Sequence, residues 1–130
     1  MADDPCPCGS GAAFEACCGP FLQGRARPKT AEALMRSRYS AYVRQNIAYL
    51  KATLWPKFQD GFDADGTARW AAENHWTGLS VLETDKGGEN DRDGTVLFEA
   101  RYLSGAKLNV HLERSRFRKK AGCWYYVEAL

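Results

Sequence analysis

The chain has 130 residues, the length of one ordinary domain, and its 45% hydrophobic and 26% charged residues exclude a disordered or fibrous class. The formal net charge is +2, but residues 1–20 hold no Lys or Arg, so all 18 basic side chains follow them. An acidic first segment disfavours nucleic acid as its partner, because phosphate backbones are held mainly by Lys and Arg.

The start of the sequence shows no basic segment followed by an apolar one, and no apolar run approaches the roughly 20 residues of a membrane span. We therefore expect a cytoplasmic chain with no membrane partner. Thiols stay reduced in that compartment, so clustered cysteines indicate metal or redox chemistry rather than a disulfide framework.

The first predicted element is a segment, residues 1–20, that is rich in Cys, Gly and Pro. Its four clustered thiols are Cys6, Cys8, Cys17 and Cys18. Four soft sulfur ligands are what tetrahedral zinc needs, although the spacing differs from the common zinc knuckle and by itself leaves a redox or disulfide role open. We expect Ser10 to cap a short helix that brings the last two thiols back toward the first two.

Helices are predicted in the next part of the chain, after a connector over residues 21–29. Thr30 is a candidate N-cap for an amphipathic helix that ends or bends at Asn46. A short helix over 47–54 ends before a proline, which cannot continue it. A turn-rich stretch follows over residues 60–66, and a third helix lies beyond it and ends near Asn74.

Beyond the third helix the apolar residues alternate with polar ones, the pattern of half-buried strands. Four strands are predicted over residues 79–81, 96–102, 108–112 and 123–128, with a hairpin turn at 120–122. Helices followed by an antiparallel meander define an α+β domain, which we assign to residues 30–130. Cys123, in the last strand, is predicted to be an inert core thiol.

The cysteine segment contains the string Cys6-Pro7-Cys8-Gly9-Ser10-Gly11 followed by Cys17-Cys18, and this resembles the SEC-C motif, a small zinc module also found at the tail of the preprotein-translocase ATPase. The resemblance implies one structural zinc per chain, held by the four thiols. Cys18 stands where the translocase version has histidine. Residues 12–15 lack the lysines usual in this motif, which argues against docking onto an acidic export chaperone.

Further segments extend the resemblance to the YchJ family over nearly the whole chain. They are residues 34–42, 76–79, 98–102, 111–117 and 124–127. The resemblance implies a small zinc-binding knob followed by a nuclear-transport-factor-2-like domain, a cone-like arrangement of three helices packed on a curved four-stranded antiparallel sheet. The elements predicted above agree with it. We expect no second SEC-C motif after Leu130.

Cone-shaped domains of this kind often enclose a pocket, and four side chains are candidates to line one: Arg38, Tyr42, His111 and Glu113. His111 and Glu113 share one face of a strand by its period of two, together with aromatic and polar neighbours. The alternative interpretation is that this face is turned to solvent. Residues two apart on a strand also stand roughly 6–7 Å apart at the backbone, so the two need not touch.

The densest basic run, which ends at Lys120, comprises Arg114, Arg116, Arg118, Lys119 and Lys120. We interpret it as a charged hairpin at the sheet edge and expect no specific nucleic-acid binding. The preferred function is a non-enzymatic binding or adaptor module for an unidentified protein or small ligand. The alternative is a pocket acid–base enzyme, isomerase- or dehydratase-like, although no residue is named as catalytic.

Overall fold

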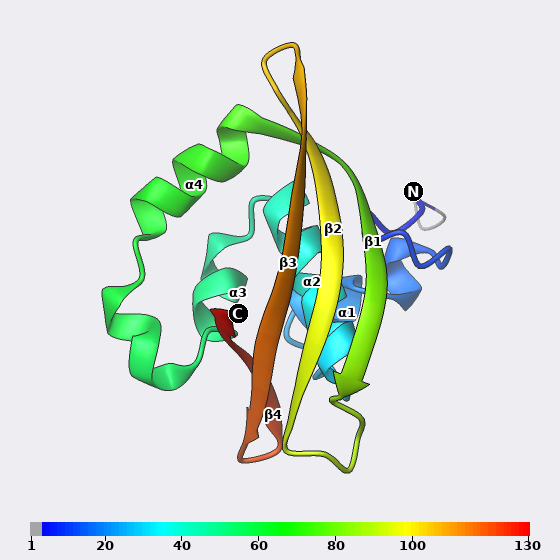
Figure 1. The fold of residues 1–130 in the computed structure, drawn as a ribbon, viewed down its shortest axis with the longest axis vertical. Helices are drawn as coiled ribbons and strands as arrows, with labels where there is room; N and C mark the ends of the chain where they lie inside the picture. Colours follow the sequence, from blue (N-terminus) through cyan, green and yellow to red (C-terminus); the bar gives the residue numbers. More distant parts are fainter. Residues whose placement is uncertain (1–3) are drawn as a thin grey trace.

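The computed structural model describes residues 4–130, in which a curved antiparallel sheet is covered by helices (Figure 1). The elements are η1 (Phe14–Ala16), α1 (Gly19–Leu22), α2 (Ala31–Val43), α3 (Ile47–Ala52), η2 (Pro56–Gly61), α4 (Ala64–Glu73), β1 (Asn74–Lys86), β2 (Asp93–Ser104), β3 (Lys107–Lys120) and β4 (Cys123–Ala129). The strands follow one another in the order β1-β2-β3-β4, so the predicted meander and α+β class are confirmed.

Side-chain caps fix where three of the helices begin. Thr30 caps α2 by accepting a 3.0 Å hydrogen bond at Oγ1, as predicted, and Asp63 caps α4 in the same way at 2.9 Å. Asn46 does not bend α2 but caps α3, through a 3.1 Å hydrogen bond at Oδ1. Within residues 4–130, no helix is both long and apolar enough to cross a membrane.

The hairpin between β3 and β4 confirms the predicted turn. Ala121 and Gly122 both have positive φ, 52° and 81°, as the favoured two-residue hairpin turns require. Cys123 follows directly at the start of β4, and β4 is an edge strand of the sheet. Its side chain is therefore half-buried, and the prediction of a core thiol is wrong.

The sheet is curved because its ladders are interrupted. The pairing of β1 with β2 shifts register twice, and the pairing of β3 with β4 shifts once, after Arg116. Such bulges bend a strand and increase its twist. Strand β4 pairs only with residues 115–120 of β3, so the first half of β3 has no β4 partner beside it (Figure 1).

Strand β3 turns its polar face inward. Its apolar residues Leu108, Val110 and Leu112 are 58%, 56% and 60% exposed, whereas Ser115 and Phe117 on the other face are fully buried. The polar-aromatic face therefore looks toward the helices. The alternative interpretation of this face as a solvent-facing side is wrong, because the helices lie across it and not across the apolar face.

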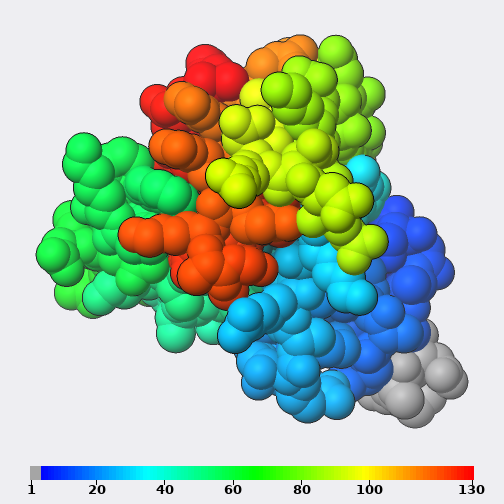
Figure 2. All heavy atoms as spheres, turned by 90° about the horizontal axis from the view of Figure 1, so that it is seen from below, coloured from blue at the N-terminus to red at the C-terminus, as the bar shows by residue number. Residues whose placement is uncertain are grey.

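The N-terminal segment packs against the rest of the chain. Cys6, Cys8 and Cys18 belong to the same buried cluster as Leu34 and Met35 of α2. The space-filling view shows the first segment in direct contact with the part of the chain that leads into α2 (Figure 2). Helix α1, which sequence reasoning missed, spans the boundary expected at residue 20; the division into segments stays a prediction.

Candidate metal centre and pocket

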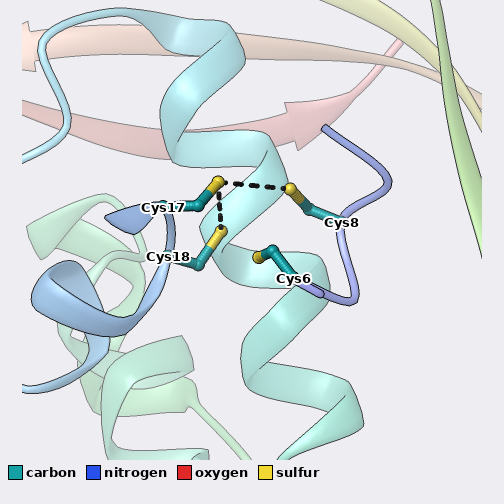
Figure 3. A group of neighbouring side chains, drawn as sticks. All are labelled: Cys6, Cys8, Cys17 and Cys18. Carbon is teal, nitrogen blue, oxygen red and sulfur yellow. Dashed lines mark hydrogen bonds between the residues drawn. The ribbon is translucent and has the colours of Figure 1, made fainter. Parts of the chain in front are cut away.

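Two short pieces of backbone bring the four thiols together (Figure 3). Cys6 and Cys8 lie on a loop that is closed by a β-bridge between Pro5 and Ala13, and the Cys6 amide donates a 2.9 Å hydrogen bond to a carbonyl across this loop. Cys17 and Cys18 lie between η1 and α1. All four side chains extend toward a common point beside α2.

The geometry of the sulfur atoms suits a metal ion. The four Sγ atoms all lie within 4.8 Å of one another, with Cys8 and Cys17 3.6 Å apart and Cys17 and Cys18 3.9 Å apart. Ligands about 2.3 Å from a tetrahedral zinc ion would be separated by about 3.8 Å. The four cysteines can therefore hold a metal ion without rearrangement of the backbone.

The thiols influence one another's ionisation. Hydrogen bonding from Cys18 and then Cys8 lowers the pKa of the Cys6 thiol. The pKa of the Cys18 thiol is raised, mainly by its hydrogen-bond contact with Cys6. The pKa of the Cys17 thiol is raised mainly by burial. Four thiolates in a buried place need a compensating positive charge, and a soft divalent cation supplies it.

Ser10 does not cap the short helix, so that prediction is wrong. The residue before η1 is Ala13, which makes no side-chain cap. Ser10 lies too early in the chain to reach that helix end. Its Oγ instead accepts a 3.2 Å hydrogen bond from the Ala12 amide and lies 3.2 Å from the Cys17 sulfur, so it supports a thiol directly.

Helix α2 contacts the thiol cluster through side chains that the sequence analysis did not assign to it. Arg36 donates a 2.7 Å hydrogen bond from Nη1 to the Cys8 carbonyl and a 2.9 Å hydrogen bond from Nε to Glu32. The Ser40 hydroxyl lies 3.5 Å from the Cys6 sulfur. Arg36 and Ser40 are four residues apart, so the sequence places them on one face of α2. It does not show that this face meets the thiol cluster.

A separate pocket lies between α2, α4 and the sheet. Its volume is about 150 Å³. It is lined by Met35, Arg38, Tyr39, Tyr42, Trp70, Trp76, Phe98, Ala100, His111, Glu113 and Tyr126. All four predicted pocket residues, Arg38, Tyr42, His111 and Glu113, therefore line one cavity. Whether they bind a ligand stays a prediction.

Glu113 is the centre of a hydrogen-bond network in this pocket. Its Oε1 lies 2.8 Å from His111 Nε2, so these two side chains do touch, and its Oε2 accepts hydrogen bonds from the Tyr126 hydroxyl at 2.9 Å and from the Ser115 hydroxyl. Burial alone would raise the pKa of Glu113, but the hydrogen bonds from Ser115, His111 and Tyr126 outweigh it and lower the pKa. Glu113 is therefore the hydrogen-bond acceptor that joins these three side chains.

Arg38 is a buried cation. Its side chain crosses to α3, where Nη1 donates to the Leu50 carbonyl at 2.9 Å and to Thr53 Oγ1 at 2.7 Å, and its guanidinium lies 4.7 Å from the centre of the Tyr126 ring. Desolvation by burial lowers its pKa. Among residues 4–130 no acidic side chain forms an ion pair with it.

Two tryptophan rings that the sequence did not indicate as pocket residues form one of its walls together with Tyr42. The rings of Trp70 and Trp76 are 5.1 Å apart between centres, and Tyr42 lies 5.5 Å from Trp76. Tyr42 thus acts here as an aromatic side chain. In the part of the chain that the structure describes, Trp76 Nε1 is buried without a hydrogen-bond partner.

The basic side chains at the end of β3 contact several different partners. Arg116 lies 3.4 Å from Glu128, the Arg118 guanidinium lies 5.2 Å from the centre of the Trp55 ring, and Lys119 Nζ donates to a loop carbonyl at 2.6 Å. Each of these three side chains therefore has a partner within the chain. Their arrangement agrees with a charged edge hairpin.

A curved antiparallel sheet with helices across one face, preceded by four clustered cysteines, is the architecture of a nuclear-transport-factor-2-like domain with a SEC-C motif. Family models match both parts: residues 30–129 match the middle, nuclear-transport-factor-2-like domain of YchJ, and residues 4–20 match the SEC-C motif. The chain belongs to the YchJ family.

Known proteins agree with this assignment. A UPF0225 protein of Geobacter sulfurreducens is 43% identical over 123 residues, which cover 95% of this chain and 76% of that protein. The solution structure of a SEC-C motif containing protein from Rhodopseudomonas palustris is 40% identical with a TM-score of 0.88, covering 96% of each chain. A crystal structure of a SEC-C motif containing protein from Psychrobacter arcticus is 31% identical with a TM-score of 0.86, covering 98% of this chain and 82% of that one.

Proposed function

We propose that the chain is a zinc-binding, non-enzymatic binding module of the cytoplasm. One zinc ion closes the four-cysteine cluster and supports α2, and α2 together with the sheet presents a pocket to a small ligand. The free thiols of the cluster suit a reducing compartment. Neither a membrane nor a specific nucleic acid is among the partners we propose.

The choice of zinc rests on the donor set. Four thiolates with no oxygen or nitrogen ligand favour a soft or borderline metal, and they fill all four positions of a tetrahedral ion. Cys8 and Cys18 are fully buried and Cys6 nearly so. A closed and buried site leaves no position for a reacting water, so the role proposed for the metal is structural.

The observation that carries the binding function is the state of Glu113. A general base needs a free acceptor, but this carboxylate already accepts from three side chains and its pKa is lowered. The pocket around it nevertheless has aromatic walls and a volume of about 150 Å³. Pockets with apolar walls and few polar groups are the usual form of small-molecule sites.

A thermal-shift screen of a metabolite library against the zinc-loaded chain tests this function. We expect a ligand that raises the melting temperature of the wild-type protein and has a smaller effect on Trp70→Ala, in the pocket wall. Phe58→Ala is the matched control, because Phe58 and Trp70 are both 42% exposed and Phe58 does not line the pocket. Ligands that shift all three proteins equally, or none, would contradict the proposal.

An acid–base enzyme is the second candidate, because His111 and Glu113 are in contact inside a pocket. In that function, a substrate would have to displace the donors from Glu113 before it could act as a base. Turnover of any ligand found in the screen, with loss of turnover but not of binding in Glu113→Gln, would favour the enzyme over the binding module.

A further inference from the structure

We propose that the pocket takes a small aromatic carboxylate, with the carboxylate held by Arg38 and the ring placed against the wall formed by Trp70, Trp76 and Tyr42. This inference rests on the proposed binding function and names the class of ligand. Three observations carry it: the size of the cavity, the distribution of hydrogen-bond donors and acceptors within it, and the arrangement of its rings.

The size of the cavity limits the ligand to about one ring. Its volume is about 150 Å³, and an apolar protein cavity of about that volume holds benzene. A ring with one short polar substituent fits such a space, whereas a nucleotide or a folded peptide does not. The part of a ligand that enters the cavity is therefore of benzoate size.

The acceptors of the pocket are already used. An ionised carboxylate has about four acceptor positions, and three donors reach Glu113. A cationic ligand would find little free acceptor capacity there. The pocket therefore disfavours amines.

The donors of the pocket are in excess. Both hydrogen bonds that Arg38 donates to described residues come from Nη1, so the other N–H groups of its five-donor fork are available. Glu113 lies near the Arg38 guanidinium but forms no direct ion pair with it, and a planar carboxylate matches the part of the guanidinium fork that remains free. The ligand group that fits these free N–H donors is therefore an acceptor with negative charge.

The rings of the wall suit an aromatic ligand. Trp70 and Trp76 meet at 64°, and Tyr42 and Trp70 meet at 80° with their centres 5.8 Å apart. Such inclined arrangements leave ring faces and edges that a further aromatic ring can contact favourably. Trp70 is 42% exposed, so this part of the wall is accessible to an entering ligand.

Calorimetric titration of the zinc-loaded full chain with benzoate, benzyl alcohol, benzylamine and acetate tests the inference. We expect benzoate to bind at least about tenfold more tightly than its neutral and cationic analogues, and acetate, which lacks the ring, to bind weakly. Tighter binding of benzylamine or benzyl alcohol would overturn the ligand class while leaving the binding module in place. Failure of all four probes would overturn this inference, and the library screen would still decide the proposed function.

Variants test the roles of the Arg38 guanidinium and of the aromatic wall separately. Arg38→Met should abolish the preference for benzoate over benzyl alcohol. Because Arg38 also ties α2 to α3, Trp70→Ala serves as a second variant that does not remove this tie, and it should weaken benzoate and benzyl alcohol alike. Phe58→Ala should bind as the wild type does. An unchanged preference in folded Arg38→Met, or unchanged affinity in Trp70→Ala, would contradict the assignment.

Discussion

Arg36 donates a 2.7 Å hydrogen bond from Nη1 to the carbonyl oxygen of Cys8, 28 residues away in sequence. A side chain of α2 thereby holds the loop that carries two of the four thiols. Two residues further along α2, Arg38 lines the pocket. The same helix therefore contacts both the thiol cluster and the pocket.

Replacing Arg36 by Gln should weaken zinc retention while leaving the protein folded. The shorter side chain loses a charge-assisted hydrogen bond to the Cys8 carbonyl, a contact for which about a tenfold change in affinity is typical. Competition with a chromophoric chelator measures the effect. Arg69→Gln, on the exposed side of α4, is the control and should retain zinc as the wild type does. Equal zinc affinity in both variants would rule out the anchoring role.

Replacing Cys8 by Ser should remove zinc and disturb residues 4–22 together with α2, because Cys8 is fully buried against that helix. The sheet should stay folded, since its ladders do not depend on the cluster. Proton–nitrogen correlation spectra show which amides move. Cys123→Ser, a half-buried cysteine outside the cluster, should keep the metal and the spectrum. Collapse of the whole Cys8→Ser spectrum would show that the metal segment and the sheet unfold as one unit.

Replacing Glu113 by Gln should lower the stability of the protein by about 1–3 kcal/mol, because a neutral amide cannot accept three hydrogen bonds as strongly as a carboxylate does. Thermal or urea unfolding measures the loss. Glu99→Gln is the control, since Glu99 is paired with Arg101 at 3.1 Å outside the pocket. Unchanged melting of Glu113→Gln together with lost ligand binding would instead favour a catalytic or recognition role.

The pH dependence of stability should reveal the same network. The folded pKa of Glu113 lies below its ordinary value of 4.5, so its contribution is complete above that value and is lost as the pH falls through the folded pKa. The difference in stability between the wild type and Glu113→Gln should therefore shrink as the pH falls below about 4.5. Both proteins contain the same thiols, so acid loss of metal cancels in the difference. Parallel stability curves for the two proteins would contradict the lowered pKa.

Strand β3 shows what sequence can and cannot predict here. Its period of two separates an apolar set, Leu108, Val110 and Leu112, from a polar-aromatic set, and the separation is correct. Which set faces inward depends on where the helices pack, and burying the apolar set would have been the ordinary expectation. The chain instead exposes it and turns the polar-aromatic set toward the helices, where Glu113 and the half-exposed His111 line the pocket.

Helix α2 and the cysteine segment show the same limit. The capping role of Thr30 is local, so sequence predicts it. The side chains of Arg36 and Arg38 point in directions about 200° apart around the helix axis. That one contacts the thiol cluster and the other lines the pocket depends on what packs on each side of α2. The four thiols were predicted as a group by their type and number, whereas the role of Ser10 depended on the path of the loop and was predicted wrongly.

The most direct test of the central claim, a closed zinc site that supports the fold around the pocket, is a titration of zinc into the reduced, metal-free chain with the melting temperature followed at each step. The claim predicts that the melting temperature rises until one equivalent is bound and then changes no further. A break at any other stoichiometry, or a melting temperature that zinc does not change, would contradict it.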